Sequence, residues 1–112
     1  MSSEMRKYFN FIVENGIPLS NINPGSDELA LKIEDSLIAI DLLRHEKIPV
    51  LGGDILIIKN GVLTYTYENW YCNEKSAEKK NDYVNRSCDI AIEYIVNIMK
   101  KNGIHMYVVF VT

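Results

Sequence analysis

The chain has 112 residues, 47% of them hydrophobic and 24% charged, which is typical of a folded globular protein and excludes a disordered one. This length predicts a single domain over residues 1–112 with one hydrophobic core. The net charge of −3 argues against a nucleic-acid-binding protein, because such proteins usually carry a basic patch or stripe.

The sequence also argues against a secreted or membrane-bound protein. Met5–Phe9 is charged, and Asn15-Gly16 interrupts the only apolar run that a secretory signal could use. No apolar run approaches the roughly 18 residues that a membrane-spanning helix needs. We therefore expect a cytoplasmic protein with no membrane partner, in which Cys72 and Cys88 stay reduced.

The first half of the chain predicts two helices separated by a loop. Residues 4–14 carry apolar side chains three and four positions apart, as on one face of a helix. Residues 15–26 are rich in Gly, Pro, Asn and Ser, which predicts a loop. A second helix is expected over residues 33–46, with an earlier start at Asp27 as an alternative, because Ser or Asp can cap a helix there.

The clearest local prediction is a β-hairpin with strands over residues 50–58 and 62–67. Asn60-Gly61 joins them, and this pair favours a type I′ turn because both of its positions need a positive φ. The resulting register pairs Leu56 with Tyr65 and, on the same side of the hairpin, Asp54 with Tyr67. The side of the hairpin that carries these pairs has the larger apolar side chains, so we expect the helices to cover it.

The last third of the chain predicts a helix over residues 82–101 and a strand over residues 106–111. The strand is a nearly continuous apolar run, which is typical of a strand buried on both faces. It could pair with either hairpin strand, and its apolarity favours the centre of the sheet. The predicted fold class is α+β, a single compact domain in the order α-α-β-β-α-β with a small three-stranded, mainly antiparallel sheet packed against helices.

No motif predicts catalysis, a metal site or a cofactor site. Gly52-Gly53 lacks the lysine and the following helix of a phosphate-binding loop, and is better interpreted as the tight start of a strand. The two Cys and two His residues lack the paired spacing of zinc ligands, and no local signature indicates a nucleophile beside a base. We therefore expect no metal and no cofactor.

The most distinctive stretch lies at the end of the hairpin, where aromatic residues alternate with acidic and amide residues. Such a mixture is typical of protein recognition surfaces, because large stiff rings lie beside hydrogen-bond acceptors. Asp54 either satisfies local donors or contacts a partner. Trp70 is either a core residue or an anchor at a binding edge, and as an anchor its replacement by Ala would weaken binding without unfolding the protein. The candidate partner-binding residues are Asp54, Tyr67, Glu68, Asn69, Trp70, Tyr71 and Glu74.

The run IPVLGGDILIIKNGVLTYTYENWYCNE, preceded by SLIAIDLL and followed by YVNRSCDIAIEYI, resembles the immunity protein 40 family of bacterial polymorphic toxin systems. The resemblance covers about residues 28–98, and its most specific parts are Gly52–Asp54 and Tyr67–Cys72. Members of such families are small cytoplasmic proteins that each bind and neutralise one cognate toxin domain. The resemblance therefore implies a non-enzymatic inhibitor whose partner is a toxin, and the acidic balance of the chain would suit a nuclease with a basic cleft.

Two other functions remain open. The first is a small enzyme or ligand-binding domain, which needs a concave site where Asp54, Tyr67, Trp70 and Cys72 converge. The second is a structural subunit of a larger assembly, which needs a permanent interface. If the aromatic segment proves to be core, the loop over residues 15–26 is the next candidate for the binding surface.

Overall fold

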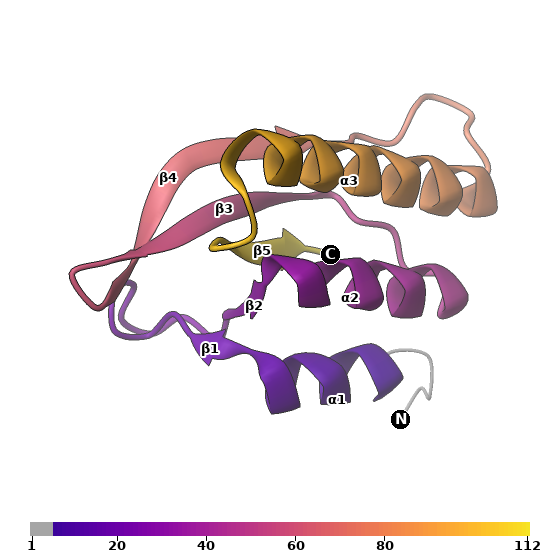
Figure 1. Cartoon of the computed structure of the whole chain (residues 1–112). Coiled ribbons are helices and arrows are strands. Elements are labelled where there is room, and N and C mark those ends of the chain that lie inside the picture. The colour runs from indigo at the N-terminus through magenta and orange to yellow at the C-terminus, as the bar shows by residue number, and fades with distance from the viewer. Residues whose placement is uncertain (1–5) are drawn as a thin grey trace.

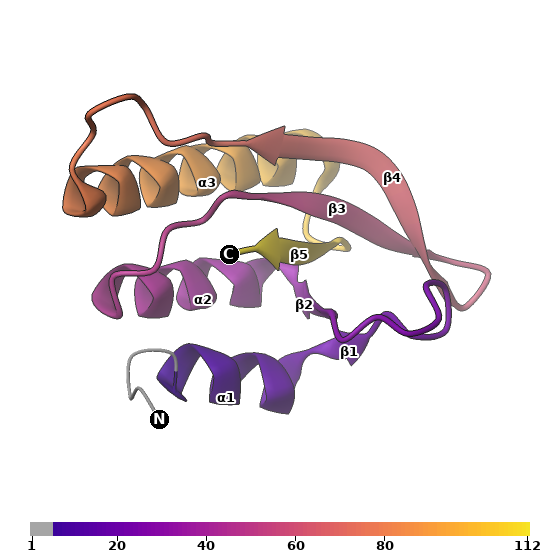
Figure 2. The same ribbon diagram turned by 180° about the vertical axis from the view of Figure 1, so that it is seen from behind.

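The computed structural model describes residues 6–112, which form an α+β fold of three helices and a five-stranded antiparallel sheet (Figure 1). The helices are α1 (Arg6–Asn15), α2 (Ile33–His45) and α3 (Lys80–Asn102). The strands are β1 (Ile17–Pro18), β2 (Leu29–Lys32), β3 (Gly52–Lys59), β4 (Val62–Tyr71) and β5 (Tyr107–Val111). The helices lie side by side on one face of the sheet, and Figure 2 shows the sheet from the other side.

The strand order is β1-β2-β5-β3-β4, so the prediction of a three-stranded sheet is wrong, as is the element order that went with it. The two additional strands come from the predicted loop and from the segment that offered an early helix start. Leu29–Lys32 forms a strand because Leu31 pairs with Val108 and Lys32 pairs with Tyr107 of β5. These partners lie far away in the sequence, and such tertiary context commonly overrides local propensity.

The three predicted helices are confirmed, with ends that differ by one or two residues for α2 and α3. The predicted start of the first helix, at residues 4 and 5, lies outside the described residues. β5 lies at the centre of the sheet between β2 and β3, as its apolar run predicted. Its Val108 and Val109 face opposite sides of the sheet, and both are almost completely buried.

Each face of the sheet carries an apolar core. The larger core lies under the helices and includes Ile55 of β3, while the smaller one, on the other face, includes Leu56. The segment after β1 brings Leu19 onto this second face, where it is buried. The prediction that the helices cover the side of Leu56 and Tyr65 is therefore wrong. Periodicity could not decide this, because both sides of β3 are apolar.

The hairpin turn is confirmed. Asn60 and Gly61 have φ values of 53° and 80°, as a type I′ turn requires. Next to the turn the register is also as predicted, with Leu56 opposite Tyr65. Farther along the register shifts, and β4 continues to Tyr71 where the predicted strand ended at residue 67.

Candidate functional site

A bulge in β4 changes the register of the hairpin. Leu56 pairs with Tyr65, but Asp54 pairs with Asn69 and not with Tyr67, so the predicted Asp54–Tyr67 pair is wrong. Three residues of β4 therefore lie opposite the single residue Ile55 of β3. Because the surplus is an even number of residues, the alternation of faces resumes unchanged after the bulge. Asn69 thus shares a face with Tyr65, and Trp70 lies on the helix-covered face.

Side chains within the bulge satisfy its main-chain groups. The Thr66 hydroxyl donates to the carbonyl oxygen of Ile55 (2.8 Å) and accepts a hydrogen bond from the N–H of Glu68 (3.1 Å). The Asn69 side-chain amide donates to the carbonyl oxygen of Tyr67 (3.2 Å), whose φ is 68°. A bulge of this kind re-aims side chains and ends regular pairing at a sheet edge. Here it leaves the Tyr67 side chain 88% exposed.

Trp70 lies opposite Gly53 and packs between the sheet and the helices. Its ring stacks on Tyr94 of α3, with centroids 4.9 Å apart, and meets the edge of Phe110 of β5 at 6.2 Å. A Cβ atom at Gly53 would lie 2.4 Å from this ring, so only glycine leaves room for it. Trp70 is 6% exposed, which confirms the core alternative. The prediction that its side chain anchors a partner at the surface is wrong.

The opposite face of the same strands carries the other polar and aromatic residues of the segment. Two successive cross-strand rows there are Val111–Gly52–Tyr71 and Val109–Asp54–Asn69. Gly52 adds no side chain to its row, and a hollow of about 310 Å³ lies at this place. We call it the Asp54 hollow and define it by Gly52, Asp54, Asn69, Tyr71 and Val111, which are among its lining residues.

Asp54 is the one charged residue among the described residues that line the Asp54 hollow. Burial raises the pKa of Tyr65, and the nearby carboxylates of Glu28 and Asp54 raise it further. Both ion pairs found within residues 6–112 involve α3 and lie away from the hollow. Asp54, which is a half-buried residue, therefore has no cationic partner in the described part of the chain.

The structure brings together some of the candidate residues and separates others. Asp54, Asn69 and Tyr71 meet at the hollow. Tyr67 and Glu68 lie in the bulge of β4, the last strand of the sheet, and Glu68 accepts a hydrogen bond from the Tyr94 hydroxyl (3.3 Å). Glu74 is exposed in the connection after β4 and does not line the hollow. Sequence reasoning missed Val111, because its place in the site depends on β5 lying beside β3.

The residues of the enzyme alternative do not converge in one pocket. Cys72 is buried against α3, where Arg86 places a guanidinium nitrogen 3.2 Å from its sulfur and Tyr83 donates to its carbonyl oxygen (2.6 Å). Asp54 lines the hollow on the opposite face, and Tyr67 extends into solvent from the bulge. The predicted convergence of these side chains with Trp70 is therefore wrong.

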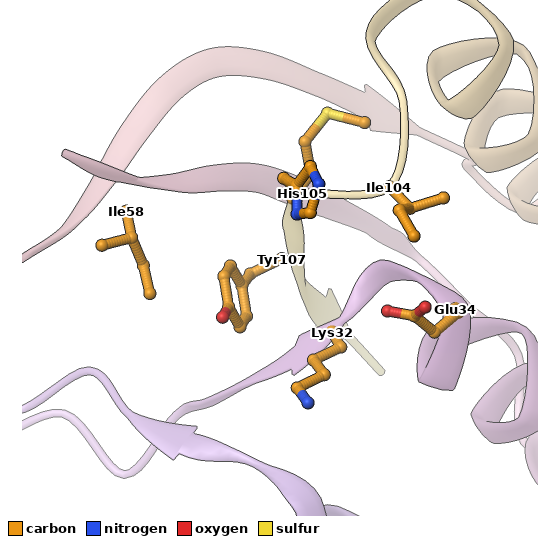
Figure 3. A pocket seen from close by; sticks show the side chains of 7 residues that line it. Lys32, Glu34, Ile58, Ile104, His105 and Tyr107 are labelled. Carbon is orange, nitrogen blue, oxygen red and sulfur yellow. The ribbon is translucent and has the colours of Figure 1, made fainter.

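A second hollow, of about 440 Å³, lies where β5 begins. Figure 3 shows polar and apolar side chains around a common space there, namely Lys32, Glu34, Ile58, Ile104, His105 and Tyr107. Within residues 6–112 no hydrogen bond joins His105 to Glu34, Lys32 or Tyr107. An active site needs a base or nucleophile oriented by a partner, and this hollow shows no such pair.

Two further properties of the described residues bear on function. No group of three or more His, Cys, Asp and Glu side chains in residues 6–112 is placed to hold a metal ion. None of the helices in this part of the chain combines the length and the apolar character needed to cross a membrane.

Comparison with known proteins places the chain in a family. The family model described as Immunity protein 40 matches residues 18–112, which is most of the chain. The match extends beyond the resemblance seen in the sequence and includes β5 and all five residues that define the Asp54 hollow. No curated protein and no solved structure matches the chain.

Proposed function

Because the chain belongs to the Immunity protein 40 family, we propose that it is a non-enzymatic inhibitor that binds one cognate toxin domain of a polymorphic toxin system. Binding would cover the active site of the toxin or the path of its substrate, and would take place in the cytoplasm of the producing cell. The family match over residues 18–112 is the observation that carries this proposal. The lack of an oriented catalytic pair in either hollow described above is consistent with it.

The surface that we propose for toxin binding consists of the Asp54 hollow and the adjoining bulge of β4. Tyr71 and Tyr67 are 79% and 88% exposed there, and exposed tyrosines next to a concave surface are frequent anchors of protein interfaces. Asp54 supplies a carboxylate in the hollow, whereas the exposed Glu68 of the bulge directs its carboxylate to the Tyr94 hydroxyl of α3. Such a surface suits a partner with a basic contact patch, because complementary charge speeds encounter and selects the partner.

The decisive experiment is co-expression with the toxic domain encoded next to the gene of this protein. The toxic domain alone should stop growth, and this chain should restore growth and co-purify with the domain. If no neighbouring domain is both toxic and neutralised, the proposed function is wrong.

A pair of surface variants tests where the toxin binds. Tyr67→Ala combined with Tyr71→Ala should weaken toxin binding at least about 30-fold, since an anchor residue contributes about 2 kcal/mol. Phe9→Ala, at an exposed aromatic residue of α1, is the matched control and should bind normally. If the double variant still binds as the wild type does, inhibition takes place through another surface. The segment around Ile17 and Ile22, which lines a hollow beside the hairpin tip, is then the next candidate.

A further inference from the structure

The Asp54 hollow has the shape of a slot for one side chain. Tyr71 of β4 and Val111 of β5 flank Gly52 of β3, which contributes no side chain between them. Neighbouring strands lie about 4.8 Å apart, so the space over the central strand is about one side chain wide. A Cβ atom at Gly52 would lie 2.3 Å from the carbonyl oxygen of Trp70, so the floor of the slot must remain bare main chain.

Main-chain hydrogen bonds hold the slot in shape. The N–H of Leu51 donates to the carbonyl oxygen of Val111 (2.8 Å), and the carbonyl oxygen of Leu51 accepts from the N–H of Cys72 (2.8 Å). These bonds extend the pairing of β3 with both neighbours past the row that contains Gly52. A preformed slot lowers the cost of ordering when a ligand group enters it.

Asp54 and Asn69 offer hydrogen-bond acceptors to the slot, and Asn73 is a further polar residue of its lining. Asp54 is a half-buried residue whose carboxylate has no cationic partner among residues 6–112. Asn69 uses its amide N–H₂ group to bind the carbonyl oxygen of Tyr67, so its side-chain oxygen is left as an acceptor. The register also places Lys32 on this face of the sheet, but it lies on the far side of β5 beside Tyr107. An unpaired carboxylate that a partner molecule covers needs a cation or several donors to satisfy it.

Arginine suits this arrangement better than lysine does. A guanidinium group is planar, offers paired donors that match a carboxylate, and stacks on aromatic rings. Asp54 supplies the carboxylate, and the exposed ring of Tyr71 supplies a stacking surface on the same face of the sheet. A lysine ammonium group could pair with Asp54, but it is not planar. It would therefore neither fit the narrow slot nor stack on the ring as well as a guanidinium group does.

We propose that the Asp54 hollow is a receptor for an arginine side chain of the toxin. The identity of this partner rests on the proposed function, whereas the preference of the hollow for arginine is a property of the chain itself. The arginine would enter between Tyr71 and Val111, bind Asp54 through two N–H groups, and donate to the side-chain oxygen of Asn69.

The preference is tested first on the purified protein alone. Amide NMR spectra are recorded at low ionic strength while the peptide acetyl-Gly-Arg-Gly-amide is added, and then peptides with lysine or citrulline in place of arginine. We expect shifts at Asp54, Asn69 and Tyr71 that are largest with arginine, smaller with lysine and absent with the uncharged citrulline. Asp54→Asn should abolish the shifts, and the matched charge-removing change Asp41→Asn, at an exposed position of α2, should leave them unchanged.

Several outcomes of the titration would overturn the proposal. It is wrong if the arginine peptide causes no shifts, if its shifts lie away from the hollow, or if citrulline causes equal ones. It is also wrong if Asp41→Asn abolishes the shifts as effectively as Asp54→Asn. None of these results depends on a toxin, so they would leave the proposed inhibitor function standing.

A second measurement uses the complex with the toxin. Asp54→Asn should raise the dissociation constant about tenfold or more, because a charge-assisted hydrogen bond covered by an interface is lost. The affinity of the variant should also depend less on salt concentration than that of the wild type. Equal affinity of Asp54→Asn and wild type for a toxin that the wild type neutralises would refute the arginine receptor and leave the function intact.

Discussion

Trp70 and Tyr71 are neighbours in the sequence but lie in regions of opposite character. On the helix-covered face, Trp70 fills the space over Gly53 and is 6% exposed. On the other face, Tyr71 is 79% exposed and borders the space that Gly52 leaves open. Strand alternation alone separates the two rings. The comparison shows that aromatic content does not identify a binding surface until the face of each ring is known.

The two regions also differ in whether their carboxylates have a cationic partner. On the side of α3, Glu78 receives two hydrogen bonds from Arg86 (2.7 and 2.8 Å), and these bonds lower the pKa of Glu78 to about 2. Beside the hollow, Asp54 has no such partner within residues 6–112. The paired carboxylate fixes the connection between β4 and α3, whereas the unpaired one is available to a partner molecule.

The largest loss of folding stability should come from removing the Trp70 ring on the helix-covered face. Trp70→Ala should lower the free energy of unfolding by about 3–5 kcal/mol, because it leaves a cavity between the sheet and α3. Urea unfolding measures this loss. The indole N–H has no acceptor within residues 6–112, so the loss should come from packing and not from a hydrogen bond. A loss below about 1 kcal/mol would mean that the ring is not part of the core.

A smaller loss of folding stability is expected when an added methyl group presses against the same ring. Gly53→Ala should cost about 1–3 kcal/mol, because its Cβ would lie 2.4 Å from the Trp70 ring and 2.8 Å from the carbonyl oxygen of Val109. In a Trp70→Leu background the cost of Gly53→Ala should fall, though not to zero, since the Val109 contact remains. Additive effects of the two changes in a double-mutant cycle would contradict direct contact between residues 53 and 70.

The paired carboxylate makes stability depend on pH. The pKa of Glu78 in the folded protein, about 2, lies below its ordinary value of 4.5, so its contribution is complete above about pH 4.5 and is lost as the pH falls toward 2. Glu78→Gln should be less stable than the wild type at neutral pH and should lose less stability on acidification. Urea midpoints across this range measure the difference. Glu93→Gln, at an exposed position of α3, should keep the wild-type profile, and an unchanged profile in Glu78→Gln would rule out this role for the pair.

The smallest change in stability should come from the exposed ring. Tyr71→Ala should alter the free energy of unfolding by no more than about 0.5 kcal/mol, as is usual for surface positions. The same change should weaken toxin binding about tenfold or more, as expected for an interface anchor. Calorimetric titration with the toxin and urea unfolding separate the two effects. A stable variant with unchanged affinity would exclude Tyr71 from the interface.

Part of the candidate site could be predicted because the two halves of the hairpin bring its residues close together. Asp54, Asn69 and Tyr71 were all among the candidates, and the structure places them around one hollow. Their pairing was predicted wrongly because the bulge adds two residues to β4. Thr66 and Asn69 were the only local hints of it, since such side chains can satisfy main-chain groups in irregular segments.

Local sequence patterns were enough to predict the Asn60-Gly61 turn, the pairing next to it, the three helices and the central place of β5. Each of these depends on local backbone preference or on apolar periodicity within one segment. The face of β3 that the helices cover could not be predicted in this way, because Ile55 and Leu56 are equally apolar and the choice depends on partners that are distant in the sequence. α3 closes the face that holds Ile55 and Trp70, while Leu19 covers part of the other and leaves the end at Asp54 open.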